Sequence, residues 1–424
     1  MNAVDGWTIS DLEALVHLDL ESLTEKTPRD FAFYYLDIAS VSEGRITVPT
    51  VETLFRDAPS RARKVVHRHD VLMSMVRPNL KGFAYFDHAG EKFIASTGFA
   101  VLTAREEADP RFILYAILSD NTSRQIEALV SGSNYPAINS SSVRRLQVLT
   151  PPKSEQTEIG DILSTVDRSI EQTEALIAKQ QCIKVGLMQH LLTRGVDQRG
   201  NLRSERTHKF RDTSLGKIPE EWRIARVGDL FEKRCEHGKA GLPVMAVVMK
   251  DGLVERAKVE RRVESNLPAE GHALVVKGDI AYNMMRMWQG VLGRAQFDCL
   301  VSPAYVVLKP RENINTHFAE WLFRDEQSVL KFRRASRGVV DDRLRLYAHD
   351  LFAIEVAVPN SVDEQEAIAE RLDAIKDRIA KENAVLEKYQ QLRVGLMQDL
   401  LTGRKRVTAL LESKSKREKV YAGD

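Results

Sequence analysis

The chain has 424 residues, of which 43 % are hydrophobic and 29 % charged, and its formal net charge at pH 7 is +2. This length exceeds what one hydrophobic core usually serves, so we expect at least two domains. The three cysteines lie far apart without metal-ligand spacing, which argues against a disulfide framework and a zinc site. No apolar run is long enough to span a membrane, so we expect a globular cytoplasmic protein.

The first segment, residues 1–150, alternates short β-rich runs with helical stretches. A run at 33–48 contains Gly44 and predicts a hairpin, and a helix is expected around Phe112 to Ile126. Residues 145–152, RLQVLTPP, alternate polar and apolar side chains and end in proline. This run predicts a strand that leads directly into the next element.

Residues 151–196 are predicted to form one long helix. Ile159, Leu163, Val166 and Ile170 recur at steps of four and three residues, as on one face of a helix. An apolar stripe of this length requires a partner helix. By itself it is equally compatible with a simple coiled-coil dimerisation element.

The second half of the chain repeats the first. VGLMQHLLT at 185–193 returns as VGLMQDLLT at 394–402, and the same offset pairs Glu155-Gln156 with Glu364-Gln365. A constant offset over this distance indicates an internal duplication. We therefore predict a linker, a second domain, a second long helix and a basic tail, at 197–216, 217–360, 361–403 and 404–424 respectively.

The second domain repeats features of the first more loosely. Trp222 corresponds to Trp7, and residues 243–259, with Gly252, correspond to 33–48 and again predict a hairpin. The tail contains many lysines and arginines. It is expected either to be disordered or to pack against the first domain and close a ring.

These duplicated features together resemble one family. GKIPEEWRIARVGDL at 216–230, a proline-ended strand followed by a helix that starts with E-Q, and GLMQxLLT at each helix end are similar to the specificity (S) subunit of type I restriction-modification systems. The resemblance extends over essentially the whole chain. It implies an α+β fold with two mixed α/β target-recognition domains, each followed by a long helix. It also implies that the two helices pair as an antiparallel coiled coil with pseudo-twofold symmetry.

The distribution of charge supports DNA binding independently of the resemblance. Both long helices are net acidic, so the small overall charge of +2 conceals a clearly basic remainder in the domains. Arginine, asparagine and glutamine can form hydrogen bonds to base edges, and lysine or arginine can contact phosphates. The candidate DNA-binding residues are Arg61, Arg63, Lys64, Arg68, Arg77, Asn79, Lys81, Ser133, Asn134 and Tyr135 in the first domain, and Arg256, Lys258, Arg261, Asn283, Arg286, Trp288, Gln289, Arg333, Arg334, Arg337 and Arg343 in the second.

The helices supply candidates for helix packing or partner binding. Gly186 and Gly395 would each cost up to about 1 kcal/mol relative to alanine inside a helix, so we expect a close approach of another helix or a partner at both. The full set is Leu163, Ile170, Gly186, Leu187, Met188, Leu191, Leu372, Ile379, Gly395, Leu396, Met397 and Leu400.

No catalytic residue is assigned. The sequence has neither a glycine-rich cofactor loop with an N-P-P-Y-type motif nor a phosphate-binding G-x-x-x-x-G-K-[ST] loop. The resemblance implies that two methyltransferase (M) subunits per chain supply S-adenosylmethionine chemistry, and that restriction (R) subunits supply ATP- and Mg-dependent translocation and cleavage. The alternative is a coiled-coil module whose basic domains bind nucleic acid without sequence preference.

Overall fold

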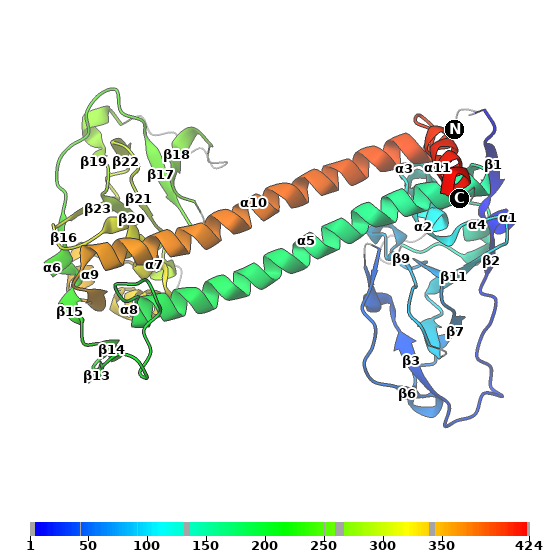
Figure 1. Ribbon diagram of the computed structural model, residues 1–424, viewed down its shortest axis with the longest axis horizontal. Coiled ribbons are helices and arrows are strands. Elements are labelled where there is room, and N and C mark those ends of the chain that lie inside the picture. Colours follow the sequence, from blue (N-terminus) through cyan, green and yellow to red (C-terminus); the bar gives the residue numbers. More distant parts are fainter. Residues whose placement is uncertain are drawn as a thin grey trace. The chain divides into compact units, whose positions relative to one another are not determined.

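The structure is a computed structural model that describes residues 5–42, 44–90, 92–130, 136–249, 251–258, 267–338 and 344–421. Its contacts divide the chain into two compact units, residues 1–174 with 384–424 and residues 175–383. Each unit contains one β-rich domain and one end of each long helix, α5 (Lys153–Arg194) and α10 (Val362–Leu401) (Figure 1).

The first domain has two four-stranded sheets, in the orders β2-β11-β8-β9 and β6-β3-β10-β7, and the pairs β1-β12 and β4-β5. Its strands are β1 (Thr8–Asp11), β2 (Val16–Leu18), β3 (Ala32–Leu36), β4 (Val41–Ser42), β5 (Arg45–Ile46), β6 (Thr53–Leu54), β7 (Ala62–Val66), β8 (Val71–Ser74), β9 (Phe83–Tyr85), β10 (Phe93–Ser96), β11 (Phe99–Ala104) and β12 (Gln147–Thr150). Its helices are α1 (Leu12–Leu15), α2 (Pro110–Leu118), α3 (Asp120–Leu129) and α4 (Ser140–Arg144).

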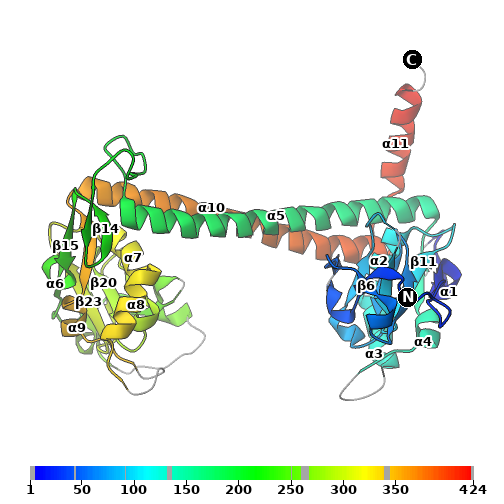
Figure 2. The same ribbon diagram turned by 90° about the horizontal axis from the view of Figure 1, so that it is seen from below.

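The second domain has one four-stranded sheet, in the order β16-β23-β20-β21, and four strand pairs. Its strands are β13 (Phe210–Thr213), β14 (Gly216–Pro219), β15 (Trp222–Arg226), β16 (Phe231–Lys233), β17 (Met245–Val248), β18 (Gly252–Glu255), β19 (Ala273–Val275), β20 (Ile280–Asn283), β21 (Leu292–Arg294), β22 (Cys299–Val301), β23 (Tyr305–Pro310) and β24 (Glu355–Pro359). Its helices are α6 (Val227–Leu230), α7 (Thr316–Arg324), α8 (Glu326–Ala335) and α9 (Ala348–Phe352) (Figure 2).

The two domains share one plan. The sheet β2-β11-β8-β9 corresponds strand for strand to β16-β23-β20-β21, and all pairings in both sheets are antiparallel. In each domain the first strand pairs with the last, as β1 with β12 and β15 with β24. The domain that precedes each long helix is therefore itself duplicated.

The two expected hairpins have different outcomes. In the second domain β17 pairs with β18 across the turn before Gly252, which confirms the hairpin. In the first domain β3 pairs instead with β6 and β10, and the hairpin at Gly44 is limited to β4 and β5. The run is interrupted because the Asp37 carboxylate accepts a hydrogen bond from the Ser40 backbone N–H (2.9 Å) and caps a 3-10 turn.

The glutamine of each E-Q pair joins its long helix to the preceding domain. Oε1 of Gln156 accepts from the backbone N–H of Asp109 (3.0 Å), and its Nε2 donates to the Pro151 carbonyl (2.9 Å). Gln365 makes the same bonds to Asn315 (2.7 Å) and Pro359 (2.9 Å). Both glutamines are buried, so each amide satisfies backbone groups where strand, helix and domain meet.

The glutamate of each E-Q pair binds an arginine that follows the other long helix. Glu364 accepts hydrogen bonds from Arg203 and from Nε1 of Trp222 (3.0 Å). Glu155 accepts two hydrogen bonds from Arg406 (2.5 and 2.9 Å), whose guanidinium lies 5.5 Å from the ring centre of Trp7. We call each of these clusters a helix junction. Each one joins the first strand region of a domain to the start of one long helix and to the chain just after the end of the other.

Glycine is required beside the second junction. Gly195 follows the last residue of α5 with φ +64°, and a Cβ there would lie 2.1 Å from Oε1 of Glu364 and 2.7 Å from the Trp222 ring. A left-handed glycine is the usual residue just after a helix end. Here it also admits the close approach of the Glu364 carboxylate.

Within each unit the two long helices run antiparallel. In the first unit the start of α5 meets the chain after α10, and Asp167 pairs with Arg393 (2.5 Å). In the second unit the start of α10 meets the chain after α5 through Glu364 and Arg203. The expected fold class, two mixed domains each followed by a long helix that pairs antiparallel with the other, is confirmed.

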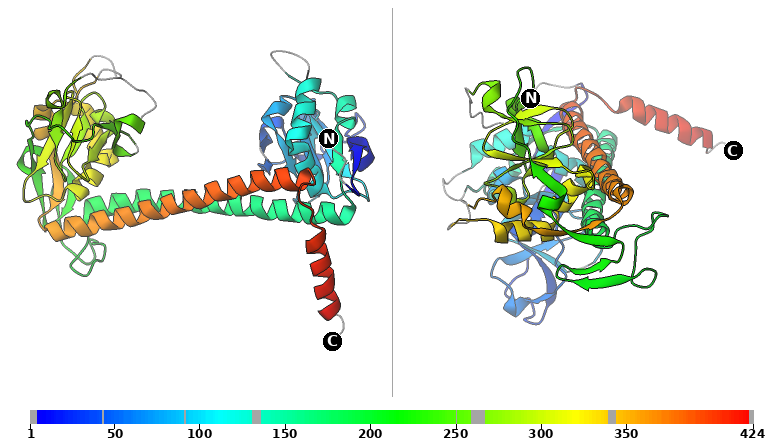
Figure 3. Two further views of the ribbon diagram at one scale, coloured as in Figure 1. Left: turned by 90° about the horizontal axis from the view of Figure 1, so that it is seen from above. Right: turned by 90° about the vertical axis from the view of Figure 1, so that its left-hand side faces the viewer.

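The start of the tail packs against the first domain, whereas most of the described helix that follows it is exposed. Val407 is buried in the core of that domain, and Lys414 pairs with Glu158 (2.6 Å). Beyond Val407 the chain forms helix α11 (Thr408–Tyr421), which extends from the end of α10 (Figure 3).

Candidate nucleic-acid interface

The loop between β8 and β9 presents three of the candidate residues in the first domain. Arg77 and Asn79 are exposed, whereas Lys81 is half-buried. Arg77 and Lys81 have φ of 49° and 50°, a left-handed conformation that is uncommon and strained for residues other than glycine. We call residues 75–81 with 136–138 loop region 1.

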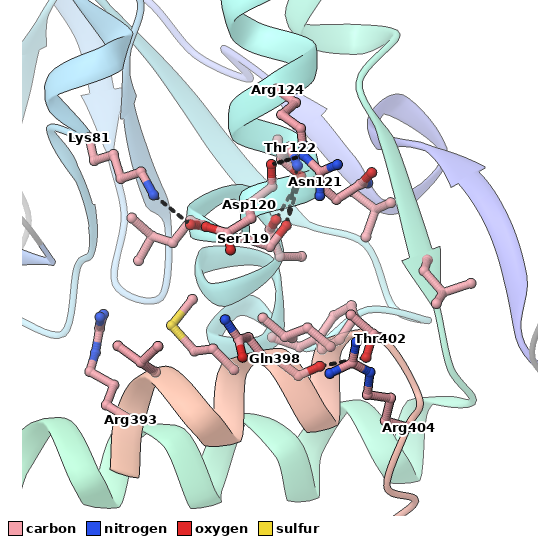
Figure 4. A pocket seen from close by; sticks show the side chains of 18 residues that line it. Lys81, Ser119, Asp120, Asn121, Thr122, Arg124, Arg393, Gln398, Thr402 and Arg404 are labelled. Atoms are coloured by element: carbon pink, nitrogen blue, oxygen red, sulfur yellow. Dashed lines mark hydrogen bonds between the residues drawn. The ribbon is translucent and has the colours of Figure 1, made fainter. Parts of the chain in front are cut away.

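Lys81 lies at the base of this loop. Its Nζ donates to the carbonyl of Leu118 at the end of α2 (3.2 Å), beside a cavity of about 730 Å³ that is also lined by α3 and α10 (Figure 4). The ammonium group therefore stabilises a helix C-terminus. Arg77 and Asn79 are the more accessible candidates of loop region 1.

In the second domain, the last residue of β20 and the equivalent loop between β20 and β21 together contain four candidates. Asn283 accepts a hydrogen bond from the Met285 backbone (3.0 Å), and Arg286 is exposed. The guanidinium of Arg333, on α8, lies 5.8 Å from the ring centre of Trp288, a cation–π contact that joins α8 to this loop. We call residues 283–291 with 333–337 and 344–350 loop region 2.

The two loop regions are held by the same backbone bonds. Met75 O accepts from Ile138 N (2.9 Å), and Met284 O accepts from Leu346 N (2.9 Å). The loop after β8 is therefore bonded to the segment that follows α3, and the loop after β20 is bonded to the segment that follows α8. The duplicated scaffold therefore presents Arg77 and Asn79 in one copy and Arg286 and Trp288 in the other.

The candidates on and after β7 do not form one group. Arg61 and Arg68 are exposed at opposite ends of β7, and Arg68 pairs with Asp87 (2.8 Å). Arg63 lies over the Phe55 ring at 5.0 Å. Lys64 must be corrected: its side chain is buried and its ammonium pairs with Asp19 (2.8 Å), so it belongs to the interior of the domain.

The remaining candidates are more scattered or cannot be placed. Lys258 is exposed and pairs with Glu255 (3.1 Å), Arg256 is half-buried, and Arg334 is exposed on α8. Gln289 is half-buried, and its Oε1 has no hydrogen-bond partner among the described residues. Ser133, Asn134, Tyr135, Arg261 and Arg343 lie outside the described residues.

In loop region 2 the candidate Arg337 lies beside Tyr347, His349 and Asp350, which the sequence did not single out. The Arg337 side chain is 63 % exposed, and its Nη2 donates to Oδ1 of Asp350 (2.5 Å) and lies 3.1 Å from Nε2 of His349. The bond to Asp350 raises the pKa of the Arg337 guanidinium. His349 stacks on Tyr347 with ring centres 5.9 Å apart. Thirteen positions separate Arg337 from Asp350, so no sequence spacing predicts the pair.

The candidates for helix packing have two environments. Leu163, Leu191, Leu372 and Leu400 are buried in the domain cores. Leu187, Met188, Leu396 and Met397 pack partly against those cores, Ile170 is buried and Ile379 is half-buried.

Gly186 and Gly395 differ from these leucines and methionines. A Cβ at either position would meet no atom within 4 Å. The expectation of a close helix approach at these glycines is therefore wrong within the described chain. The other alternative, the close approach of a partner protein at these two glycines, stays a prediction.

The described residues contain neither a helix that is long and apolar enough to cross a bilayer nor a cluster of three or more histidine, cysteine or acidic residues able to hold a metal ion.

Residues 62–179 match a family model described as the type I restriction modification DNA specificity domain.

Curated relatives match over much greater lengths. The chain is 22 % identical to a putative type I restriction enzyme MjaX specificity subunit of Methanocaldococcus jannaschii, over 95 % of this chain and 94 % of that protein. It is 24 % identical to the MjaVIII specificity subunit of the same organism, over 76 % of each.

Similarity of fold extends over the same length. The crystal structure of a type I restriction-modification system S subunit from M. genitalium superposes with a TM-score of 0.59 at 16 % identity, covering 94 % of this chain and 98 % of that one. The duplicated domains, the paired helices, the family model and these relatives agree. The chain is similar over almost its whole length to the specificity subunits of type I restriction-modification systems, a non-catalytic class of subunit, and its residues 62–179 match their DNA specificity domain.

Proposed function

We propose that this subunit recognises a bipartite DNA target, with one domain for each half-site and the paired helices as a ruler that sets the gap. The observation that carries the proposal is the contrast between loop regions 1 and 2. Equivalent backbone bonds hold the two loops, yet the loops present different polar side chains. Two copies of one scaffold with different reading groups are suited to two different half-sites.

The domain assignment follows the same division. Residues 1–150 form target-recognition domain 1 and 217–360 form domain 2, while 151–196 and 361–403 are the spacer helices. Residues 197–216 connect the first helix to the second domain and 404–424 are the tail. Each of these two segments also supplies an arginine to a helix junction. Arg203 of 197–216 pairs with Glu364, and Arg406 of 404–424 pairs with Glu155.

The chemistry of the loop regions fits recognition in the major groove. Arginine can bond two acceptors of guanine, and asparagine can bond adenine in the same way, whereas exposed lysines and arginines contact phosphates without sequence information. Arg77, Asn79 and Arg286 are exposed on loops that a rigid sheet positions. We assign base contacts to these loops and phosphate contacts to Arg61, Arg68 and Lys258.

The subunit directs partners that carry the catalysis. We propose two methyltransferase subunits per chain, which supply S-adenosylmethionine, and restriction subunits, which supply ATP- and Mg-dependent cleavage in the cytoplasm. The partner surface is proposed at Gly186 and Gly395, where open space adjoins exposed apolar side chains at equivalent positions. These side chains are Ile183, Val185, Leu392 and Val394.

A selection experiment tests this function against non-specific binding. The chain, co-purified with its methyltransferase subunit, is used to select duplexes from a random pool at low and at moderate salt. A bipartite consensus that sharpens as salt rises is the expected result, because higher salt weakens phosphate contacts and leaves base contacts to discriminate. Selected duplexes without a consensus at any salt concentration would contradict the proposal.

A further inference from the structure

We propose that Arg337 recognises a guanine in the half-site of the second domain, and that Asp350 is a positioning residue that fixes the Arg337 guanidinium. This inference rests on the proposed function and adds one base contact with its chemistry. It follows from the arrangement of side chains at the end of α8 and the start of α9.

The backbone of Arg337 is fixed on both sides. Arg337 N donates to Arg345 O, and Arg345 N donates to Arg337 O, both at 2.9 Å, so the two residues form an isolated antiparallel bridge. The next residue along, Leu346, is tied to Met284 O (2.9 Å), next to the β20–β21 loop. Arg337 is therefore anchored in loop region 2, beside Arg286 and Trp288.

The guanidinium is fixed as well. Asp350 is only 14 % exposed, whereas Arg337 is 63 % exposed, so a nearly buried carboxylate holds one edge of an accessible guanidinium. Nη2 has two hydrogens and donates one of them to Oδ1 of Asp350. When Nε2 of His349 donates to Oδ2 of Asp350 (3.3 Å), the second Nη2 hydrogen and the neighbouring Nη1 or Nε form a two-point donor for another acceptor. Without that bond from His349, Oδ2 of Asp350 is buried without a hydrogen-bond partner in the described chain.

This arrangement differs from an ordinary surface ion pair. Two exposed, flexible side chains gain little from pairing, and a phosphate contact needs only a mobile positive charge. A guanidinium whose orientation is set in advance instead matches the N7 and O6 acceptors of guanine, which require a planar, two-point donor. The second-domain pair meets this requirement.

The carboxylate of this pair has no counterpart at the equivalent place in the first domain. Helices α4 and α9 occupy the same position in the two copies, and the third residue of each is Ser142 and Asp350 respectively. The scaffold is thus conserved between the copies while the carboxylate is present in only one. Such a difference is expected of a residue that serves one half-site.

The test compares the wild-type complex with three variants, after the methylated motif of the wild type has been mapped. Arg337→Lys keeps the charge but not the planar donor, Arg337→Ala removes both, and Asp350→Asn removes the positioning carboxylate. Lys309→Ala is the matched control, because Lys309 forms an exposed ion pair with Glu232 (2.7 Å) in the same domain. Thermal unfolding and co-purification with the methyltransferase establish that each variant is folded.

Both Arg337 variants are expected to make one guanine position of one half-site degenerate, with discrimination reduced roughly 5- to 150-fold, while the other half-site is unchanged. Asp350→Asn is expected to relax the same position less, and Lys309→Ala to relax none. Binding of Arg337→Lys should retain the wild-type salt dependence, because no phosphate contact is lost.

An unchanged motif in Arg337→Lys and Arg337→Ala would overturn this inference alone. So would uniformly weaker binding of Arg337→Ala with a salt slope smaller by about one, the behaviour of a phosphate contact. A wild-type complex that methylates no split motif would overturn the proposed function, and this inference with it.

Discussion

At the scale of single residues, burial separates basic side chains that the sequence treats alike. Lys64 and Arg337 were both candidates for DNA contact because both lie in basic stretches. The structure buries the Lys64 ammonium against Asp19 and leaves the Arg337 guanidinium exposed against Asp350. Their partners lie 45 and 13 positions away, and contacts over such separations depend on the fold rather than on local pattern.

The junction at Glu364 gives a prediction at this scale. Arg203 and Glu364 are 7 % and 9 % exposed, and removal of one member leaves the other charge buried without its partner. Arg203→Met is therefore expected to lower the free energy of unfolding by about 3–5 kcal/mol, as measured by chemical denaturation. The control is Lys217→Ala, which breaks the exposed pair with Glu205 (2.7 Å) and should cost less than about 1 kcal/mol. A loss that small in Arg203→Met would show that the junction does not depend on this pair.

At the scale of elements, the helices were predictable and the sheets were only partly so. Periodic leucines and isoleucines, and proline before E-Q, indicated α5 and α10 close to their observed ends. The same E-Q pairs proved to hold the junctions, which no local signal indicated. Strand partners were harder, because β3 pairs with β10 across more than fifty residues rather than with its neighbour in sequence. Such pairing depends on which apolar faces meet in the folded domain.

The seam of α5 contains a buried polar residue that should reduce stability. Gln180 continues the stripe of Thr173 and Ile177, and neither polar atom of its amide has a hydrogen-bond partner among the described residues. A polar residue in a seam specifies the register of the helices at a cost in stability. Gln180→Leu is expected to raise the free energy of unfolding by about 1–2 kcal/mol. A lower free energy of unfolding for Gln180→Leu would instead indicate that the Gln180 amide forms hydrogen bonds in solution.

The open glycines give a prediction about assembly. Because nothing lies within 4 Å of a Cβ at position 186, Gly186→Leu should leave the fold of the isolated chain intact. The larger side chain is expected to reduce co-purification with the methyltransferase subunit at least tenfold, an effect of about 1.4 kcal/mol or more. Gln181→Leu, an exposed position on another face of α5, serves as the control. Normal assembly of Gly186→Leu would remove this surface from the proposed interface.

At the scale of the whole molecule, the duplication was the feature most accessible from sequence. Two nearly identical nine-residue segments located both long helices, and the two domains then proved to share strand order and helix order. The loops that differ between the copies carry the candidate reading residues, and these loops have little local pattern. The scaffold was therefore easier to predict than the base contacts placed on it.

Independent half-sites are the corresponding prediction. Asn79→Ala in the first domain and Arg286→Ala in the second both alter exposed loop residues in separate compact units. Each is expected to relax one half-site only, and the double variant should combine the two effects additively. Duplex selection with the three complexes measures this. A single variant that changes both half-sites would contradict the assignment of one domain to each.

The most direct test is to express this chain with its methyltransferase subunit in a host that lacks DNA methylation, and to map methylated adenines by single-molecule sequencing. The account predicts one split motif, methylated on both strands, with two specific half-sites at a fixed gap. Co-purification of the two subunits without any methylated motif, or methylation scattered without sequence preference, would contradict it.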